Sequence, residues 1–284
     1  MNTKLPNAFR LTLALVVIAA VCGLAQRRWG GRGFLSELRT AREVPSGSTG
    51  TPTWTNQPAF AKDVFTFVRI RYDRGSGWGG GWATDLPDSD LNLSYRLQQV
   101  TALRVDPDGR ILRLTDPALM DFPFIYIVEP GSLYLSAAEV DALRRYLLNG
   151  GFLWLDDFWG EREWANCEEV MKEVFPDRRF VELPLTHPIY HTVFEITSKA
   201  QIPAIQYGVA SRYTGVTWER PDAREVHHRA IFDDRGRLMV LATHNTDNGD
   251  GWEREGEDDY YFHNFSEKIA YPLAINVLVY VMTH

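Results

Sequence analysis

The most constraining feature of this sequence is a strand–helix–strand pattern in the middle of the chain. Residues 124–129 form a nearly continuous apolar run, which is typical of a strand buried on both faces of a parallel sheet. Ser136, followed three residues later by Glu139, is a capping box and predicts a helix that ends at the glycines 150–151. The apolar run 152–155 follows directly. Two strands joined by a helix in this way run parallel, so the sequence predicts an α/β fold.

The remaining elements follow from apolar periodicity and turn residues. Residues 202–213 show no regular pattern and are predicted to be irregular. Further strands are expected at 65–72, at 103–114 as a strand or a hairpin, at 180–184 on an edge, and at 230–242 as a hairpin; further helices are expected at about 88–100, at 164–175 and at 265–282, the last packed across one face of the sheet.

The N-terminus carries an export pattern. Lys4 and Arg10 precede an apolar run over residues 11–25, which is typical of a secretory signal peptide. The run is short for a membrane span, which needs ~20 apolar residues. Two arginines directly after the run would be an unusual start for a mature protein, so an uncleaved membrane anchor is the alternative. Residues 1–25 are therefore predicted to be a signal peptide or an N-terminal membrane anchor, and the protein to be exported, periplasmic or extracytoplasmic.

The next segment differs in composition from its neighbours. Residues 26–61 are rich in Gly, Ser, Thr and Pro, which predicts a flexible linker. Residues 62–284 then form the folded domain.

Charge and cysteine usage exclude two classes of function. The formal net charge of −7 argues against a nucleic-acid partner, because neutralising phosphates needs a basic surface. The two cysteines, Cys22 and Cys167, cannot build a disulfide framework or a cysteine-based zinc site.

A glycine-rich loop follows the strand predicted at 65–72. Gly75, Gly77 and Gly80 fit the G-x-G-x-x-G spacing of dinucleotide-binding loops. The next helix begins only after Pro87, so its N-terminus is misplaced for holding a pyrophosphate. This arrangement favours a glycine and tryptophan loop at the rim of a cleft over a nucleotide site.

Polar residues follow two of the predicted parallel strands. Asp156 and Asp157 come directly after the strand at 152–155, and His244 begins a polar stretch after the strand that ends at 242. In open α/β sheets, ligands bind outside the carboxyl ends of the strands. Asp156, Asp157 and His244 are therefore the candidate catalytic residues, provided that both segments reach one edge of the sheet.

The second polar stretch is also a candidate cation site. Asp247, Asp250 and Glu253 supply the oxygen ligands that calcium or magnesium prefers, although their spacing is not that of an EF-hand. If Asp156 and Asp157 meet His244 and Asp247 across the edge of the sheet, a mixed carboxylate and imidazole metal site is expected. The alternative is a solvated acidic loop whose Asp and Asn side chains satisfy their own turns. A divalent cation is the cofactor that the sequence suggests.

Aromatic residues crowd the predicted loops. Together with Asn and Asp they form platforms suited to a sugar or a peptide, and exposed aromatic groups often mark interfaces. The alternative is that they pack long loops onto the domain. The candidate ligand-binding residues are Trp78, Trp82, Trp159, Asn245, Asp247 and Trp252.

Three separated motifs carry a resemblance to a known family. They are Gly-Gly-Phe-Leu-Trp-Leu-Asp-Asp at 150–157, His-Asn-Thr-Asp-Asn-Gly-Asp-Gly-Trp-Glu at 244–253, and Ile-Asn-Val-Leu-Val-Tyr at 275–280. In this order they resemble bacterial domain-of-unknown-function family 4159, from about residue 65 to residue 284. The resemblance implies a class I glutamine-amidotransferase-like fold, which is a flavodoxin-like parallel sheet with helices on both faces, and an association with export signals or membrane segments. It implies no particular activity.

The sequence departs from true amidotransferases at the nucleophile. Those enzymes place a cysteine on a strained turn after a glycine-rich strand, whereas Asp156 and Asp157 stand at that turn here. Cys167 is a helix away, so thiol-based acyl transfer is disfavoured.

Two functions remain open from the sequence. The first is an exported, non-catalytic binding or scaffold domain that holds an envelope protein or a small polar ligand. The second is a metal-assisted hydrolase of an envelope or extracellular substrate. For the hydrolase, the candidate ligands or bases are Asp156, Asp157, His244, Asp247 and Asp250.

Overall fold

The computed structural model describes residues 35, 37–48, 50–60, 63–74 and 81–284. The chain divides into two units, residues 1–38 and 39–284, and the second contains the sheet and its helices. The predicted signal or anchor at 1–25 lies outside the described residues. Trp78 and the three glycines of the G-x-G-x-x-G pattern lie outside them as well.

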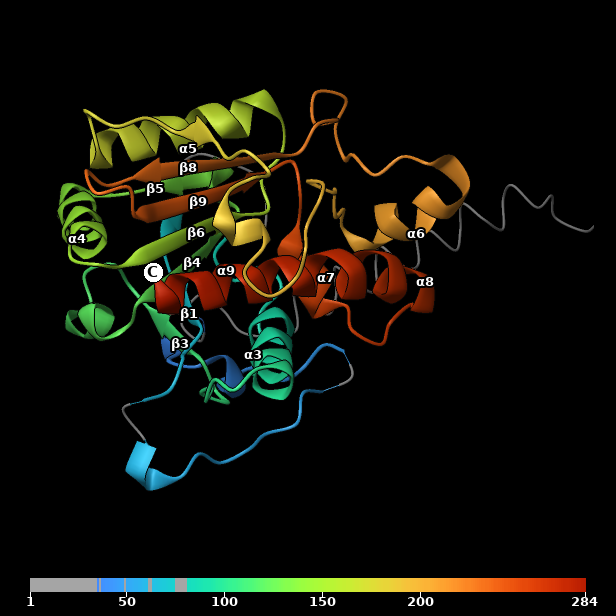
Figure 1. The fold of residues 1–284 in the computed structure, drawn as a ribbon, viewed down its shortest axis with the longest axis horizontal. Coiled ribbons are helices and arrows are strands. Elements are labelled where there is room, and N and C mark those ends of the chain that lie inside the picture. Colours follow the sequence, from blue (N-terminus) through green and yellow to red (C-terminus); the bar gives the residue numbers. More distant parts are fainter. Residues whose placement is uncertain (1–34, 36, 49, 61–62, 75–80) are drawn as a thin grey trace, which may run out of the picture. The chain divides into compact units, whose positions relative to one another are not determined.

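Among the described residues, a seven-stranded sheet forms the centre of the domain, in the order β3-β1-β4-β6-β9-β8-β7 (Figure 1). The first five strands in this order run parallel, while β8 is antiparallel to β9 and β7 is antiparallel to β8. The strands are β1 (Val68–Ile70), β3 (Arg110–Leu112), β4 (Phe124–Val128), β6 (Phe152–Asp156), β7 (Val181–Glu182), β8 (His227–Phe232) and β9 (Leu238–His244); β2 (Asp73–Arg74) and β5 (Leu133–Tyr134) form a separate pair.

Helices cover both faces of this sheet (Figure 1). The main helices are α3 (Asp88–Val100), α4 (Ala137–Leu148), α5 (Gly160–Val174), α6 (Ile205–Thr214), α7 (Asn248–Glu253), α8 (Asp259–Tyr261), the π-helix η6 (Phe262–Ala270) and α9 (Tyr271–Thr283). Short 3-10 turns are η1 (Ala41–Glu43), η2 (Pro58–Phe60), η3 (Pro117–Asp121), η4 (Pro130–Ser132) and η5 (Pro188–Tyr190).

The central strand β4 shows why the sheet is buried on both sides. Phe124, Tyr126 and Val128 belong to the core that contains residues of α3 and α9. Ile125 and Ile127 belong to the core that contains residues of α4 and α5. Because side chains alternate along a strand, an unbroken apolar run fills two cores at once. The predicted α/β, flavodoxin-like fold is confirmed.

Several local predictions are confirmed by the structure. The strands expected at 65–72, 124–129 and 152–155 appear as β1, β4 and β6, and residues 230–242 fall in the β8–β9 hairpin. Ser136 and Glu139 form the reciprocal capping box at the start of α4.

Two local predictions are wrong in part or in full. Residues 103–114, expected as a strand or a hairpin, contain the strand β3 but no hairpin, because β3 pairs in parallel with β1 and Val105 bridges to Phe65. Residues 202–213 are not irregular, because α6 occupies most of them. Gly208 lets this helix approach its neighbour, since a Cβ there would lie 2.4 Å from the ring of Tyr261. A glycine that reads as a helix breaker in the sequence is thus a packing contact in the fold.

Part of the predicted linker is attached to the domain by hydrogen bonds. Ile111 donates its backbone N–H to the carbonyl of Arg39, and the Trp54 indole donates to the carbonyl of Val105 at 2.8 Å. Gly47 and Thr51 of the same segment donate to Asp88 and Asn92 of α3, so the segment contacts both this helix and the region of β3.

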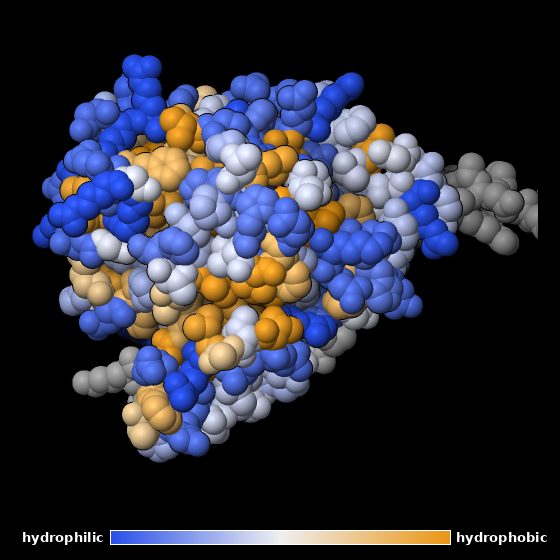
Figure 2. Space-filling model, in the orientation of Figure 1, coloured by the Kyte–Doolittle hydropathy of each residue, from blue (hydrophilic) through white to orange (hydrophobic). Residues whose placement is uncertain are grey.

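The C-terminal helical stretch from Asp259 to Thr283 is long and apolar enough to cross a membrane by length and composition alone. Most of its apolar residues are instead buried in the core that covers one face of the sheet, as predicted. Figure 2 shows hydrophobic residues near the middle of the visible face, where α9 lies, between more hydrophilic margins. A core helix of a globular domain accounts for this pattern.

Candidate functional site

The carboxyl ends of three adjacent parallel strands each lead into polar residues. Glu129 follows β4, Asp157 follows β6, and the stretch from Asn245 to Asp247 follows β9. The structure brings the segments after β6 and β9 into contact, because Asp156 accepts a hydrogen bond from the backbone N–H of Asn248 at 3.0 Å.

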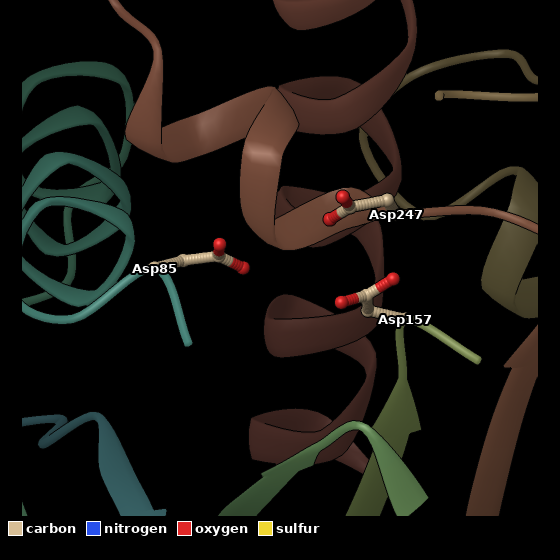
Figure 3. Close-up of side chains that lie close together, drawn as sticks. All are labelled: Asp85, Asp157 and Asp247. Carbon is tan, nitrogen blue, oxygen red and sulfur yellow. The ribbon is translucent and has the colours of Figure 1, made fainter. Parts of the chain in front are cut away.

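Three carboxylates from different segments converge at this edge. Asp85 lies in the loop before α3, Asp157 follows β6, and Asp247 precedes α7. One carboxylate oxygen from each residue lies within 4.8 Å of the others. Figure 3 shows the three carboxyl groups facing a common space. We call Asp85, Asp157 and Asp247 the aspartate triad.

The triad keeps oxygen atoms available for a ligand. Asp157 uses Oδ1 to accept from the Trp159 indole at 3.0 Å, and Asp247 uses Oδ1 to accept from the backbone N–H of Asp250 at 2.7 Å. Asp85 Oδ2 is buried and has no hydrogen-bond partner among the described residues. No ion pair between described residues includes a member of the triad.

The electrostatics of the triad are unfavourable for three bare carboxylates. Burial raises the pKa of Asp85, and the nearby charge of Asp250 raises it further. Burial raises the pKa of Asp157, and the charge of Asp85 raises it further. Burial also raises the pKa of Asp247, and the charge of Asp157 adds to this effect. Like charges in a poorly solvated space cannot all ionise without a compensating cation. Oxygen-only donor sets of this kind suit magnesium or calcium.

Arg69 positions the loop that carries Asp85. Its fully buried guanidinium pairs with Asp90 on α3. It also donates to the carbonyls of Trp82 at 3.0 Å and Thr84 at 2.9 Å. Glu129 holds the same loop from the other side, by accepting from Thr84 Oγ1 at 3.0 Å. The main chain before Asp85 is therefore fixed from β1 and from β4.

Asp156 positions the other side of the site. Its fully buried carboxylate accepts from the hydroxyls of Tyr126 at 2.9 Å and Thr243 at 2.5 Å. It also accepts from the side chain of Asn248 at 2.7 Å and from the backbone N–H groups of Asn248 and Gly249. Burial raises the pKa of Asp156, against the opposing effect of these donors. Because its oxygens are occupied, Asp156 holds the first turn of α7 in place and offers no free oxygen to the triad.

A second group of carboxylates shares Asp85 with the triad. Ligand oxygens of Asp85, Asp250 and Glu253 also lie within 4.8 Å of one another. Arg254 Nε lies 3.3 Å from Asp250 Oδ1 and 2.9 Å from Glu253 Oε2. Burial raises the pKa of Glu253 to about 10, and the charges of Asp85 and Asp250 add to this effect.

Glu219 lies in the same electrostatic environment. Burial raises its pKa to about 7, and the charge of Asp250 contributes in the same direction. Its carboxylate accepts from the backbone N–H of Ala204 at 2.8 Å.

The backbone around the site is strained. Among the described residues other than glycine, Asp85, Glu129, Asp157 and Asn245 have positive φ angles, from 51° to 63°. All four lie at this edge of the sheet or in the Asp85 loop. Left-handed backbone at such residues is costly and persists where the surrounding structure enforces it, which is common at functional sites.

His244 lies outside the triad. Its Nε2 is 3.1 Å from the carbonyl of Gly160, its Nδ1 is 3.1 Å from an Arg229 nitrogen, and its ring stacks on Phe158. Burial lowers the pKa of His244 to about 4. The structure thus brings Asp157 together with Asp247 but does not add the imidazole, so a mixed carboxylate and imidazole site is not assembled.

The candidate ligand-binding aromatics are mostly packed inside the domain. Trp252 is fully buried against Phe67 and Trp154. Trp159 is also buried, and its indole N–H donates a hydrogen bond to Asp157. Trp82 is partly exposed. Asn245 is also buried and accepts from the backbone N–H of Gly160 at 2.8 Å.

Sequence reasoning missed Asp85 and Glu219. Asp85 stands between the glycine-rich stretch and Pro87, outside any periodic pattern. Its one signal is that it lies in the connection after β1, which neighbours β4 in the sheet. Glu219 lies in a loop after α6 and carries no local signal.

These observations define a class of protein, namely a flavodoxin-like α/β domain with a partly buried acidic cluster at the carboxyl ends of its parallel strands. Residues 66–282 match the model of the family described as a domain of unknown function, DUF4159, and the chain belongs to that family. The resemblance seen in the three sequence motifs is thereby confirmed. A search of curated proteins finds no match.

Proposed function

We propose that this domain binds a divalent cation, magnesium or calcium, through the aspartate triad of Asp85, Asp157 and Asp247. The observation that carries the proposal is the convergence of three carboxylates with no ion-pair partner among the described residues. A hard divalent cation takes six or more oxygen ligands, so water or ligand oxygens complete its shell. Asp85 and Asp157 are only partly buried, which gives the cation a route to the site.

The proposed role of the cation is to hold a small polar ligand or an envelope protein outside the cytoplasm. The acidic cluster alone would repel an anionic group, whereas a bound cation presents a positive centre to it. Export rests on the basic and apolar pattern of residues 1–25. Fractionation of cells that express the full chain tests this part, and recovery in the cytoplasm alone would contradict it.

Thermal unfolding with and without added cations tests the triad. The chelated full chain should gain stability on addition of magnesium, calcium or manganese, because a ligand that binds only the folded state stabilises it. Asp157→Asn and Asp247→Asn should lose most of that gain. Asp177→Asn changes an exposed carboxylate elsewhere and should retain it. No stabilisation of the parent chain by any of these ions would remove the proposal.

A metal-assisted hydrolase is the second candidate, and Glu219 is the observation that favours it. A carboxyl group with a pKa of about 7 beside the acidic cluster is suited to accept or donate a proton near neutral pH. A bound cation would supply activation of a water molecule. Cys167 is buried on α5 and burial raises its pKa, so its thiol is not an available nucleophile.

Hydrolysis of phosphate ester, carboxylic ester, peptide and glycoside substrates tests the second candidate. With manganese present, turnover of one class should be abolished by Asp157→Asn. Glu219→Gln should remove the rise in rate with pH near 7. Absence of turnover in every class, with cation binding intact, would leave the binding role alone.

A further inference from the structure

Asp85 belongs to both carboxylate groups of the site. Asp157 and Asp247 make up one group with it, and Asp250 and Glu253 of α7 make up the other. We propose that a second divalent cation binds to Asp85, Asp250 and Glu253, with the Asp85 carboxylate bridging the two cations. This inference rests on the proposed function, because the first cation is the one held by the triad.

The position of Asp85 Oδ2 points to this second site. The atom is buried and accepts no hydrogen bond from a described residue. It lies against the first turn of α7, because a Cβ added at Gly249 would come within 2.2 Å of it. Gly249 stands directly before Asp250 in that turn. A buried carboxylate oxygen without a partner is costly, and a cation between Asp85 and α7 would satisfy it.

The charge of the whole cluster also favours two cations. The five carboxylates of the two groups are linked through Asp85, and Arg254 is the basic side chain that pairs with them among the described residues. Once all five carboxylates are ionised, as cation binding requires, the single guanidinium leaves an excess of four negative charges. Two divalent cations balance this excess, and one does not.

A carboxylate that bridged the two cations would hold them close together. Metal pairs in hydrolytic sites typically lie about 3.5–4 Å apart and stabilise both the attacking and the leaving oxygen. The strained backbone of Asp85, with φ of 63°, is held by the loop contacts from Arg69 and Glu129. A paired site of this kind favours the hydrolase over a binding role alone.

Titration of the chelated full chain with Mn²⁺, followed by electron paramagnetic resonance, tests the proposal. The parent chain should bind two Mn²⁺ ions with an exchange-coupled spectrum. Glu253→Gln should bind one Mn²⁺ with an uncoupled spectrum, and Asp177→Asn should behave as the parent. If Glu253→Gln does not fold, Asp250→Asn removes another ligand of the same cation. Its side-chain amide keeps an oxygen that can accept the hydrogen bond from the Ile205 N–H.

The possible outcomes separate this inference from the proposed function. If the parent chain binds one Mn²⁺, and this ion is lost in Asp157→Asn and retained in Glu253→Gln, the proposal of a second cation is wrong and that of the first stands. Two ions without exchange coupling would overturn the Asp85 bridge. No bound Mn²⁺ would overturn both proposals.

Discussion

The substitution Gly249→Ala tests Asp85 as a ligand without altering any carboxylate. Gly249 lies in the first turn of α7, and a Cβ there would lie 2.2 Å from Asp85 Oδ2 and 3.3 Å from the Tyr126 hydroxyl. The first distance is far below van der Waals contact, so the carboxylate of Asp85 must move by about 1 Å or more. We expect Gly249→Ala to weaken cation binding because it displaces a ligand from another element of the fold.

The stability of the chelated protein should change little. Alanine is favoured over glycine within a helix by about 1 kcal/mol. Displacing the end of one side chain from its rotamer costs about 0.5–1.5 kcal/mol. The two effects oppose each other, so the free energy of unfolding measured in urea with a chelator should stay within about 1 kcal/mol of the parent value.

Cation affinity should fall at least about tenfold, which corresponds to about 1.4 kcal/mol. Isothermal titration with Mg²⁺ and Mn²⁺ measures this, with Asp177→Asn as the control. Unchanged affinity in a folded Gly249→Ala protein would refute Asp85 as a ligand. A loss of several kcal/mol of stability in the chelated protein would instead refute the inference that the carboxylate is free to move.

Three further predictions concern the framework of the site and the core. Asp156→Leu should lower the free energy of unfolding in urea by at least about 3 kcal/mol, because it leaves backbone N–H groups of α7 buried without an acceptor. Arg69→Met should cost about 3–5 kcal/mol in the same assay and weaken cation binding, because it leaves Asp90 buried without its partner and releases the Asp85 loop. Burial lowers the pKa of His228 to about 3, so between pH 6.5 and 3 the unfolded state takes up a proton that the folded state does not. The free energy of unfolding should therefore fall as the pH falls through this window, and His228→Gln should remove about 2 kcal/mol of that loss at pH 5.

The proposed cation and the strained backbone are related. Asp85 and Asp157 both have positive φ angles. These angles place two carboxylates against a third in a poorly solvated space, where the chelated protein gains nothing from their proximity. A cation bound by the triad would relieve the repulsion between these carboxylates.

Patterns within short stretches of sequence determined the core of the fold. The apolar run that became β4, the capping box at Ser136 and the glycines 150–151 predict the strand–helix–strand unit, because each depends on neighbouring residues alone. The same reasoning placed Asp157 and Asp247 at the carboxyl edge of the sheet, since parallel strands end on one side.

The tertiary structure decided which side chains meet at that edge. Asp85 joins the site through the contacts of Arg69 and Glu129 with its loop, and the sequence around it carries no periodic signal. His244 lies outside the site because its ring is packed against Phe158. Asp156 accepts hydrogen bonds from the first backbone N–H groups of α7, so its role is structural. Local sequence specifies backbone conformation through short-range sterics and periodic burial. The meeting of carboxylates far apart in the chain depends instead on how separately formed elements pack together.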